Sequence, residues 1–176
     1  MKKIVAISDT HMEKWMPPPK LEELMEGADL VVHCGDFHTY EVYKKIKRDY
    51  ELKAVFGNDD DARIKRELSE TEKFDMEKLK IGLIHKGNYL NNFDDLGYGA
   101  RELGVDILVF GHIHRFVLEK MGDVLLISPG SPTKPRLSIA SCAEILIDGT
   151  KVDVRMRIVQ DVFCGMEAIE KVEKVR

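Results

Sequence analysis

The amino-acid sequence predicts an α/β fold in which two β-sheets pack against each other with helices on their outer faces. The first two thirds of the chain alternate short apolar runs with helical segments, whereas the last third is rich in strands joined by short turns. The chain has 176 residues, of which 44% are hydrophobic and 33% charged, as expected for a folded chain without membrane spans. This length predicts a single domain, which we place at residues 1–160, followed by a helical tail at 161–176.

Three strands and two helices are predicted in the first third of the chain. Residues 2–8, 29–34 and 52–56 are apolar runs bounded by polar residues, which is typical of strands buried on both faces. Residues 21–26 follow a proline-rich loop and are expected to be helical. Residues 40–49 predict an amphipathic helix because their apolar side chains fall on one side.

The middle of the chain continues this alternation. We expect a charged helix near residues 61–68, a buried strand at 79–84, a helix around 90–103 and a buried strand at 106–110. Gly104 is expected to end the second of these helices, because glycine tolerates left-handed backbone at a helix C-terminus. The first two thirds of the chain therefore contribute five buried strands.

The last third changes from crossovers to hairpins. Gly122-Asp123 and Asp148-Gly149 are turn signals between strand-like segments. We expect four strands around these turns, at residues 116–120, 124–127, 138–147 and 152–159.

Two apolar segments outside these elements have several readings. The tail at 161–176 carries apolar residues at mostly three-residue spacing, which predicts a helix that packs on the domain, frays or binds a partner. Trp15 and Met16 lie beside Pro17–Pro19, where they would pack on the domain, cover a substrate or contact a partner.

Charge and cysteine content disfavour several classes of protein. The net charge of -4 at pH 7 argues against a nucleic-acid surface built on bulk basicity. Cys34, Cys142 and Cys164 are scattered, so neither a disulfide framework nor a cysteine metal site is indicated. The N-terminal apolar run stops at Ser8 and Asp9, too soon for a secretory leader. We therefore expect a cytoplasmic protein.

A metal-type ligand follows each of the five buried strands. Loops at the carboxyl ends of neighbouring strands form a crevice in α/β sheets, so these side chains are expected to converge. In Asp9-Thr10-His11 and His112-Ile113-His114, the spacing places both outer side chains on one side of an extended chain, about 7 Å apart. A single histidine after a strand is usually an ordinary polar residue, but ligands at all five strand ends favour a metal centre. The predicted ligands are Asp9, His11, Asp36, Asn58, His85, His112 and His114.

The types of ligand indicate which ions would bind. Imidazole and carboxylate ligands without thiolate select first-row ions, of which Mn is our first choice and Ni, Co, Fe and Zn are alternatives. The number of ligands favours two ions. With Asp36 as a bridge, two ions about 3.5–4 Å apart would hold a hydroxide between them and clamp a phosphate ester during its attack.

The motifs around these residues resemble those of the calcineurin-like metallophosphoesterase superfamily. Its D-x-H, G-D, G-N, H and G-H-x-H blocks match Asp9-Thr10-His11, Gly35-Asp36, Gly57-Asn58, His85 and Gly111-His112-Ile113-His114, in the same order. Ser128-Pro129-Gly130-Ser131 with Pro135-Arg136 resembles a further block of the small prokaryotic phosphodiesterase branch, which is related to vacuolar sorting protein 29.

The resemblance implies a four-layer αββα sandwich of two mixed β-sheets flanked by helices. It also implies how the ligands are divided between the ions. The first ion would be held by Asp9, His11, Asp36 and His114. The second ion would be held by Asp36, Asn58, His85 and His112.

Two positions depart from the pattern of the superfamily. Its phosphoprotein phosphatases carry a general-acid histidine directly after the G-N pair, whereas this chain has Asp59, which disfavours esters with poor leaving groups. The G-N-x-D pattern of the phosphodiesterase branch is kept, and it makes Asp60 a further candidate catalytic residue. Lys86 stands where a second histidine is usual, and we hypothesise that it offers a cation to the phosphate.

The sequence thus predicts a metal-dependent phosphodiesterase with a small phosphodiester substrate, for which nucleotide-derived diesters are candidates. The predicted catalytic residues are Asp36, Asn58, His85, Lys86 and Asp60. The alternatives are a non-catalytic protein-binding scaffold of the same fold and a phosphomonoesterase. Nucleic acid is a disfavoured substrate, and the oligomeric state stays open.

Three further residues near the motifs are not predicted to be metal ligands. His33 lies inside a predicted strand and is expected in the core. His38 is either a surface residue or faces the cleft. Arg136 either reaches the phosphate or forms a surface ion pair.

Overall fold

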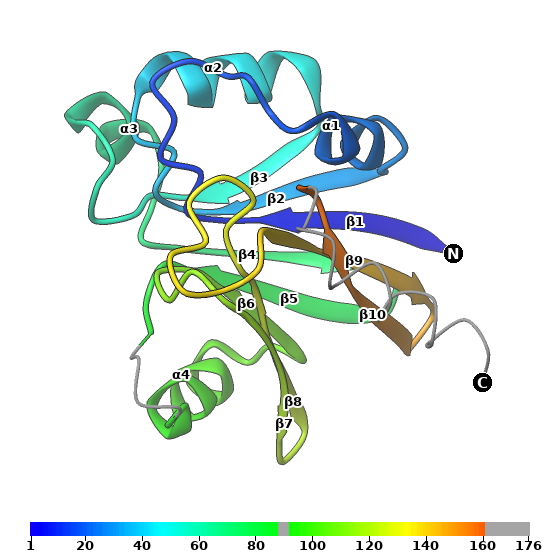
Figure 1. Cartoon of the computed structure of the whole chain (residues 1–176). Coiled ribbons are helices and arrows are strands. Elements are labelled where there is room, and N and C mark those ends of the chain that lie inside the picture. Colours follow the sequence, from blue (N-terminus) through cyan, green and yellow to red (C-terminus); the bar gives the residue numbers. More distant parts are fainter. Residues whose placement is uncertain (88–91, 161–176) are drawn as a thin grey trace.

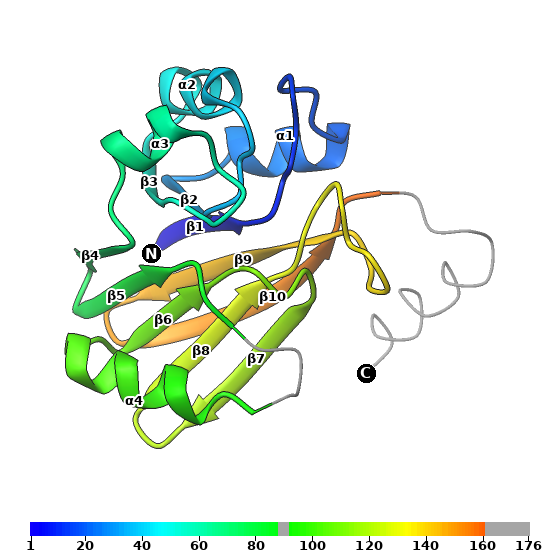
Figure 2. The same cartoon turned by 90° about the vertical axis from the view of Figure 1, so that its left-hand side faces the viewer.

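The computed structural model describes residues 1–87 and 92–160, and this part of the chain forms two five-stranded sheets that pack face to face (Figure 1). Helices cover the outer face of each sheet, so the layers follow the order helix, sheet, sheet, helix (Figure 2). The predicted four-layer arrangement of two mixed sheets is therefore confirmed.

The first sheet has the strand order β10-β9-β1-β2-β3. The central strand β1 runs parallel to β2 and antiparallel to β9, and β2 runs parallel to β3. The strands are β1 (Lys2–Ile7), β2 (Leu30–Cys34), β3 (Leu52–Val55), β9 (Ser141–Asp148) and β10 (Lys151–Ile158).

The second sheet has the order β4-β5-β6-β8-β7. Strands β5, β6 and β8 are parallel, and the edge strands β4 and β7 run antiparallel to their neighbours. The strands are β4 (Thr71–Met76), β5 (Leu79–Ile84), β6 (Ile107–Phe110), β7 (Phe116–Met121) and β8 (Val124–Pro129).

Four helices cover the sheets in the described part of the chain. Helices α1 (Pro19–Glu26), α2 (Tyr40–Asp49) and α3 (Ala62–Glu67) lie on the first sheet, and α4 (Asp94–Leu103) lies on the second (Figures 1 and 2). Gly104 ends α4 in left-handed backbone with φ 66°, as predicted. None of these helices combines the length and the apolar character that crossing a membrane requires.

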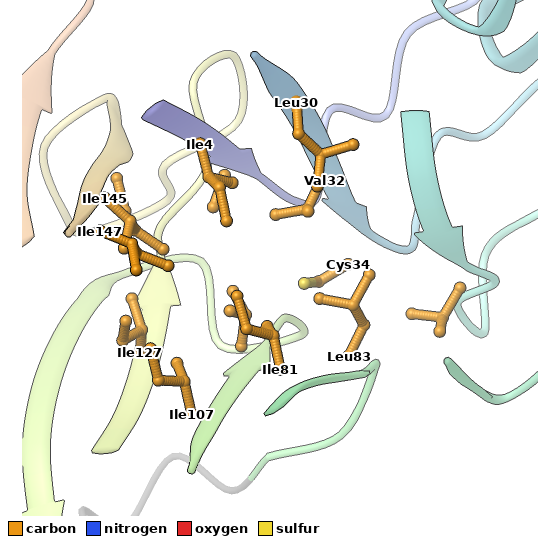
Figure 3. Packing of buried hydrophobic residues seen from close by; sticks show 14 residues of the cluster. Ile4, Leu30, Val32, Cys34, Ile81, Leu83, Ile107, Ile127, Ile145 and Ile147 are labelled. Atoms are coloured by element: carbon orange, nitrogen blue, oxygen red, sulfur yellow. The ribbon is translucent and has the colours of Figure 1, made fainter. Parts of the chain in front are cut away.

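The core is divided by the alternation of side chains along the strands. In β1, Ile4 and Ala6 point into the space between the two sheets, whereas Val5 and Ile7 pack under the helices of the first sheet. Figure 3 shows the layer between the sheets, where Ile4 and Val32 of the first sheet face Ile81 of the second. Burial on both faces explains why β1 is apolar at successive positions.

The structure contains one strand that the sequence analysis did not predict. Strand β4 alternates exposed and half-buried residues, and its inward side chains Phe74 and Met76 pack against the core between the sheets. Three of its six residues are charged, because an edge strand exposes one face to water, and these charges obscure the apolar pattern. The other predicted strands and helices are present with ends shifted by at most a few residues, and the predicted tail at 161–176 lies outside the described residues.

Candidate metal centre

The seven predicted ligands come from loops after five strands that are divided between the two sheets. Strands β1, β2 and β3 of the first sheet and β5 and β6 of the second direct their carboxyl ends toward the same region (Figure 1). The expected convergence at strand ends is thus present, but it crosses the boundary between two sheets rather than following one sheet edge.

Five of the ligands have left-handed backbone, which non-glycine residues rarely adopt. Each such residue costs about 1–3 kcal/mol, and strain of this kind gathers at functional sites. It turns the chain sharply after β1, β2 and β6, so that neighbouring ligands reach one cleft. These residues are Asp9 (φ 54°), His11 (φ 44°), Asp36 (φ 59°), His112 (φ 78°) and His114 (φ 57°).

Glycines before the ligands allow the turns to pack closely. A Cβ atom on Gly111 would collide with Ser8 Oγ and the Cys34 carbonyl oxygen, and one on Gly57 would collide with the Asp36 carboxylate. The loops that carry the ligands therefore approach one another more closely than any larger residue would permit.

The first group of ligands consists of Asp9, His11 and His114, whose ligand atoms all lie within 4.8 Å of one another. His114 Nε2 lies 3.3 Å from Asp9 Oδ1 and 3.3 Å from His11 Nε2. The two imidazole rings stack with their centroids 5.0 Å apart. Asp9 is held in place by the backbone N–H of His112, which donates to both of its carboxylate oxygens.

The second group consists of Asp36, His85 and His112, and the amide of Asn58 lies beside it. His85 Nε2 lies 3.3 Å from Asp36 Oδ2 and 3.1 Å from Asn58 Oδ1. The same Asn58 oxygen lies 2.9 Å from His112 Nδ1. All seven predicted ligands are therefore brought together.

Hydrogen bonds on the outer sides of three histidines fix which nitrogen faces the cleft. His85 Nδ1 donates to the Cys34 carbonyl oxygen at 2.6 Å, and His114 Nδ1 donates to the Lys134 carbonyl oxygen at 2.6 Å. His11 Nδ1 lies 2.9 Å from the Asp59 carboxylate, an acceptor. The Nε2 lone pairs of the neutral rings consequently point into the cleft, as ligating histidines require.

The nitrogen and oxygen atoms that face the cleft carry lone pairs, and they repel one another unless a positive charge lies among them. The Nε2 lone pairs of the neutral His11 and His114 rings meet at 3.3 Å, and His85 Nε2 faces two oxygen acceptors, which attract either a proton or a metal ion to it. Such a set of nitrogen and oxygen donors fits divalent first-row ions. The residues present therefore suit the metal ions that the motifs imply.

The pKa values follow from burial and from neighbouring charges. Burial lowers the pKa of His11, His112 and His114, which favours the neutral form that binds metal. Burial alone would raise the pKa of Asp36, but the hydrogen bond and charge of His85, with further contacts, lower it to about 2. Burial opposes protonation of His85, yet Asp36 and Asp9 raise its pKa.

Asp60 lies behind the ligands. Its carboxylate is buried and accepts hydrogen bonds from the backbone N–H groups of Asp36 (3.0 Å), Gly57 (2.7 Å) and His38 (2.9 Å). It thereby joins the turn after β2 to the turn after β3. This placement favours a positioning role for Asp60, and the catalytic role predicted from the motif stays a prediction.

The remaining candidates surround the cleft. Lys86 is exposed directly after His85, and Arg136 is exposed in the loop between β8 and β9. His38 faces the cleft side, with Nδ1 3.8 Å from Asp59 Oδ2, and these two residues form a third group of potential ligands with His11. His33 is fully buried, as expected of a core residue. Trp15 packs partly buried under the helices, while Met16 is exposed.

Three groups that hold the outer nitrogens of the histidines are not predicted from the sequence. The motif marks Asp59 only as the residue in the place of a general acid, whereas its carboxylate lies 2.9 Å from His11 Nδ1. The carbonyls of Cys34 and Lys134, which accept from His85 and His114, give no signal in the sequence because every residue has a carbonyl. Asp59, directly after Gly57-Asn58, is the only one of these groups whose residue type suggests a partner for a histidine.

The chain is similar to known proteins in both sequence and fold. Residues 1–148 match the family described as the calcineurin-like phosphoesterase superfamily domain. A probable metallophosphoesterase of Methanothermobacter thermautotrophicus is 32% identical over 161 residues, which cover 87% of this chain and 90% of that protein. A phosphodiesterase of Methanocaldococcus jannaschii is 29% identical over 146 residues, covering 73% of this chain and 82% of that protein.

Solved structures share the fold at lower sequence identity. The crystal structure of Vps29 from Chaetomium thermophilum superposes with a TM-score of 0.74 at 20% identity. The match covers 89% of this chain and 94% of that one. This likeness supports the architecture of the two packed sheets.

Proposed function

Since the chain belongs to the calcineurin-like phosphoesterase superfamily, we propose that it is a metal-dependent phosphodiesterase with a centre for two divalent ions. The observation that carries the proposal is the position of Asp36. Its Oδ2 atom lies 3.5 Å from His11 Nε2 of the first group and 3.3 Å from His85 Nε2 of the second. One carboxylate thus adjoins both groups, as a bridge between two ions requires.

In this proposal, each ion takes four ligands. The first is held by Asp9, His11, Asp36 and His114, and the second by Asp36, Asn58, His85 and His112. Mn is our first choice because carboxylate, amide and imidazole ligands suit it, and Ni, Co, Fe and Zn fit the same set. When bound, such ions would polarise the phosphate oxygens and lower the pKa of a bound water.

The residues of the chain position the ligands and the substrate. The carbonyl groups of Cys34 and Lys134 hold His85 and His114 with their Nε2 atoms directed inward. Lys86 is exposed beside His85, where it would neutralise charge on a phosphate oxygen. If Lys86→Ala leaves both KM and kcat unchanged, that role of the lysine is wrong.

The residue after the G-N pair favours diesters with good leaving groups. The Asp59 carboxylate accepts a hydrogen bond from His11 Nδ1 and has no proton to give to a leaving group while it is ionised. An alkoxide leaving group would depend on such a proton. An aryl oxide, or another oxyanion whose conjugate acid has a low pKa, would leave without it. The phosphodiesterase name of the M. jannaschii relative supports the same choice.

A non-catalytic protein-binding scaffold is the second candidate. The likeness to the Vps29 fold supports it. The complete set of inward-facing ligands favours the enzyme, because a scaffold has no chemical need for two adjoining groups of histidine and carboxylate.

The test is hydrolysis of bis(p-nitrophenyl) phosphate beside p-nitrophenyl phosphate by metal-stripped protein refilled with Mn, Ni, Co or Zn. We expect metal-dependent cleavage of the diester that exceeds cleavage of the monoester and is lost in Asp36→Ala. Asp153→Ala, at an exposed position of β10, is the matched control. Faster cleavage of the monoester would favour a phosphomonoesterase, and no turnover despite bound metal would favour the scaffold.

A further inference from the structure

A depression with a volume of about 410 Å³ lies next to the candidate metal centre. Its position follows from the chain itself, because Ile113 stands between the ligands His112 and His114. On the other side, Pro135 follows Lys134, whose carbonyl accepts the hydrogen bond from His114. The depression is lined by Ile113, Arg115, Pro135, Arg136, Leu137 and Ser138.

The loop between β8 and β9, which forms one wall, is tied to the ligand-bearing turn after β1. Ser131 Oγ donates to the Asp9 carbonyl oxygen at 2.7 Å and accepts from the backbone N–H of Lys134 at 2.8 Å. Thr133 Oγ1 donates to the Thr10 carbonyl oxygen. Figures 1 and 2 show this loop in yellow beside the carboxyl end of β1. The wall is therefore fixed relative to the metal ligands.

Two arginines place positive charge in this depression. The Arg115 guanidinium lies over the ring of Phe93, 5.9 Å from its centroid, and Phe93 is itself buried. Arg136 is exposed and has left-handed backbone with φ 55°, which turns the chain at the rim. Arg136 stands two residues after Lys134, whose carbonyl accepts the hydrogen bond from the ligand His114. Guanidinium groups bind phosphate and carboxylate in two-point contacts.

The wall formed by the loop between β8 and β9 also has an apolar part. Leu137 is fully exposed, with a relative accessibility of 108%, although a large aliphatic side chain gains from burial. Pro135 and the buried Ile113 line the same depression. A ligand with a flat apolar face would cover this wall and bring an anionic group to the arginines.

We infer that this depression binds a nucleoside unit bearing a second phosphate, so that the substrate class of the centre is a nucleotide phosphodiester whose leaving group is the anion of an alcohol of low pKa and whose nucleoside carries a further phosphate. The inference rests on the proposed phosphodiesterase function. The base would lie on the apolar wall of Leu137 and Pro135, and Arg115 and Arg136 would hold the second phosphate. These two arginines are thereby specificity-determining residues.

The test compares two aryl diesters that differ in one phosphate. They are the 5′-(p-nitrophenyl phosphate) of thymidine and the same ester carrying a 3′-phosphate. We expect kcat/KM of the metal-loaded protein to be at least tenfold higher for the 3′-phosphorylated ester. Arg136→Gln, and separately Arg115→Gln, should reduce this ratio at least tenfold, whereas Arg155→Gln at an exposed position of β10 should leave it unchanged.

A binding measurement separates this inference from the proposed function. Calorimetry with the metal-loaded protein should show thymidine 3′,5′-bisphosphate binding at least tenfold more tightly than thymidine 5′-monophosphate, and Arg136→Gln should remove the difference. Hydrolysis of both esters at equal efficiency, with equal binding of the two nucleotides, would overturn the inference and leave the phosphodiesterase intact. Preferential binding without hydrolysis of any ester would support the site and contradict the phosphodiesterase.

Discussion

The Oδ2 atom of Asp36 and the Nε2 atom of His11 lie 3.5 Å apart, although the two residues belong to different groups of metal ligands. They follow different strands, β2 and β1, which pair in parallel. Because both strands end at the same edge, the left-handed turns at Asp36 and His11 direct the side chains into one cleft. The two groups of ligands therefore adjoin through a single carboxylate.

Replacing Asp60 should destabilise the protein, because its carboxylate satisfies three backbone N–H groups. A buried donor left without a partner costs about 1–3 kcal/mol, so Asp60→Ala should lower the free energy of unfolding by about 3 kcal/mol. Urea unfolding of the metal-free protein measures this change. Asp75→Ala, an exposed aspartate of β4, should change it little. An Asp60→Ala variant as stable as the parent would show that other groups or water satisfy these amides.

Replacing Asp59 should weaken metal binding. The carboxylate accepts from His11 Nδ1 at 2.9 Å and thereby fixes the ring that presents Nε2 to the cleft. Loss of such outer contacts costs about 10–100-fold in metal affinity, and we expect about tenfold for Asp59→Ala. Competition with a fluorescent chelator measures the affinity, with Asp123→Ala, in the turn between β7 and β8, as control. Equal affinities in Asp59→Ala and the parent would mean that packing alone orients His11.

The N-cap of α3 should make stability depend on pH. Burial opposes ionisation of Asp61, but hydrogen bonds from the backbone N–H groups of Ile64, Tyr40 and Arg63 lower its pKa below the ordinary 3.8. A carboxyl with a lowered pKa stabilises the fold above pH 3.8, and this contribution is lost as the pH falls through the folded-state pKa. Asp61→Ala should therefore cost about 1 kcal/mol at pH 7.

The cost of Asp61→Ala should shrink at pH values below 3.8. Urea unfolding at several pH values measures it, and Asp61→Asn, which keeps a capping oxygen, should lose little at pH 7. A cost that stays constant down to acid pH would show that the charge of Asp61 does not contribute.

Removing metal should lower the melting temperature. A ligand that binds only the folded state at 100 times its Kd stabilises the fold by about 2.7 kcal/mol. Treatment with a chelator should thus destabilise the parent protein, and scanning calorimetry measures the shift. Asp36→Ala should show a smaller shift, because it removes a ligand from both groups. Equal melting temperatures with and without chelator would argue that the folded chain holds no ion.

The ligands could be predicted from the sequence because residues of a metal-binding type stand directly after recognisable strands. Asp9, His85 and His112 each follow an apolar run whose strand character is unambiguous, and the side chains keep their identity whatever the loop does. The same rule failed for β4, where the charged residues Lys73 and Asp75 face outward and mask the strand. Burial on one face leaves an apolar signal too weak to recognise among charges.

The sequence could not reveal how the ligands are held. The pairing of His114 with the Lys134 carbonyl depends on where the loop between β8 and β9 lies, which only the packing of two sheets determines. The role of Asp60 depends likewise on two separate turns meeting at its carboxylate. Local patterns carry no information on such contacts between distant segments.

The central claim, that two ions share Asp36, is tested most directly by diffraction from crystals grown with Mn, using the anomalous signal of the metal. The account predicts two peaks about 3.5–4 Å apart, one beside His11 and His114 and the other beside His85 and His112, with the Asp36 carboxylate between them. A single peak, or a peak between His38 and Asp59 with the Asp36 carboxylate free of metal, would contradict it.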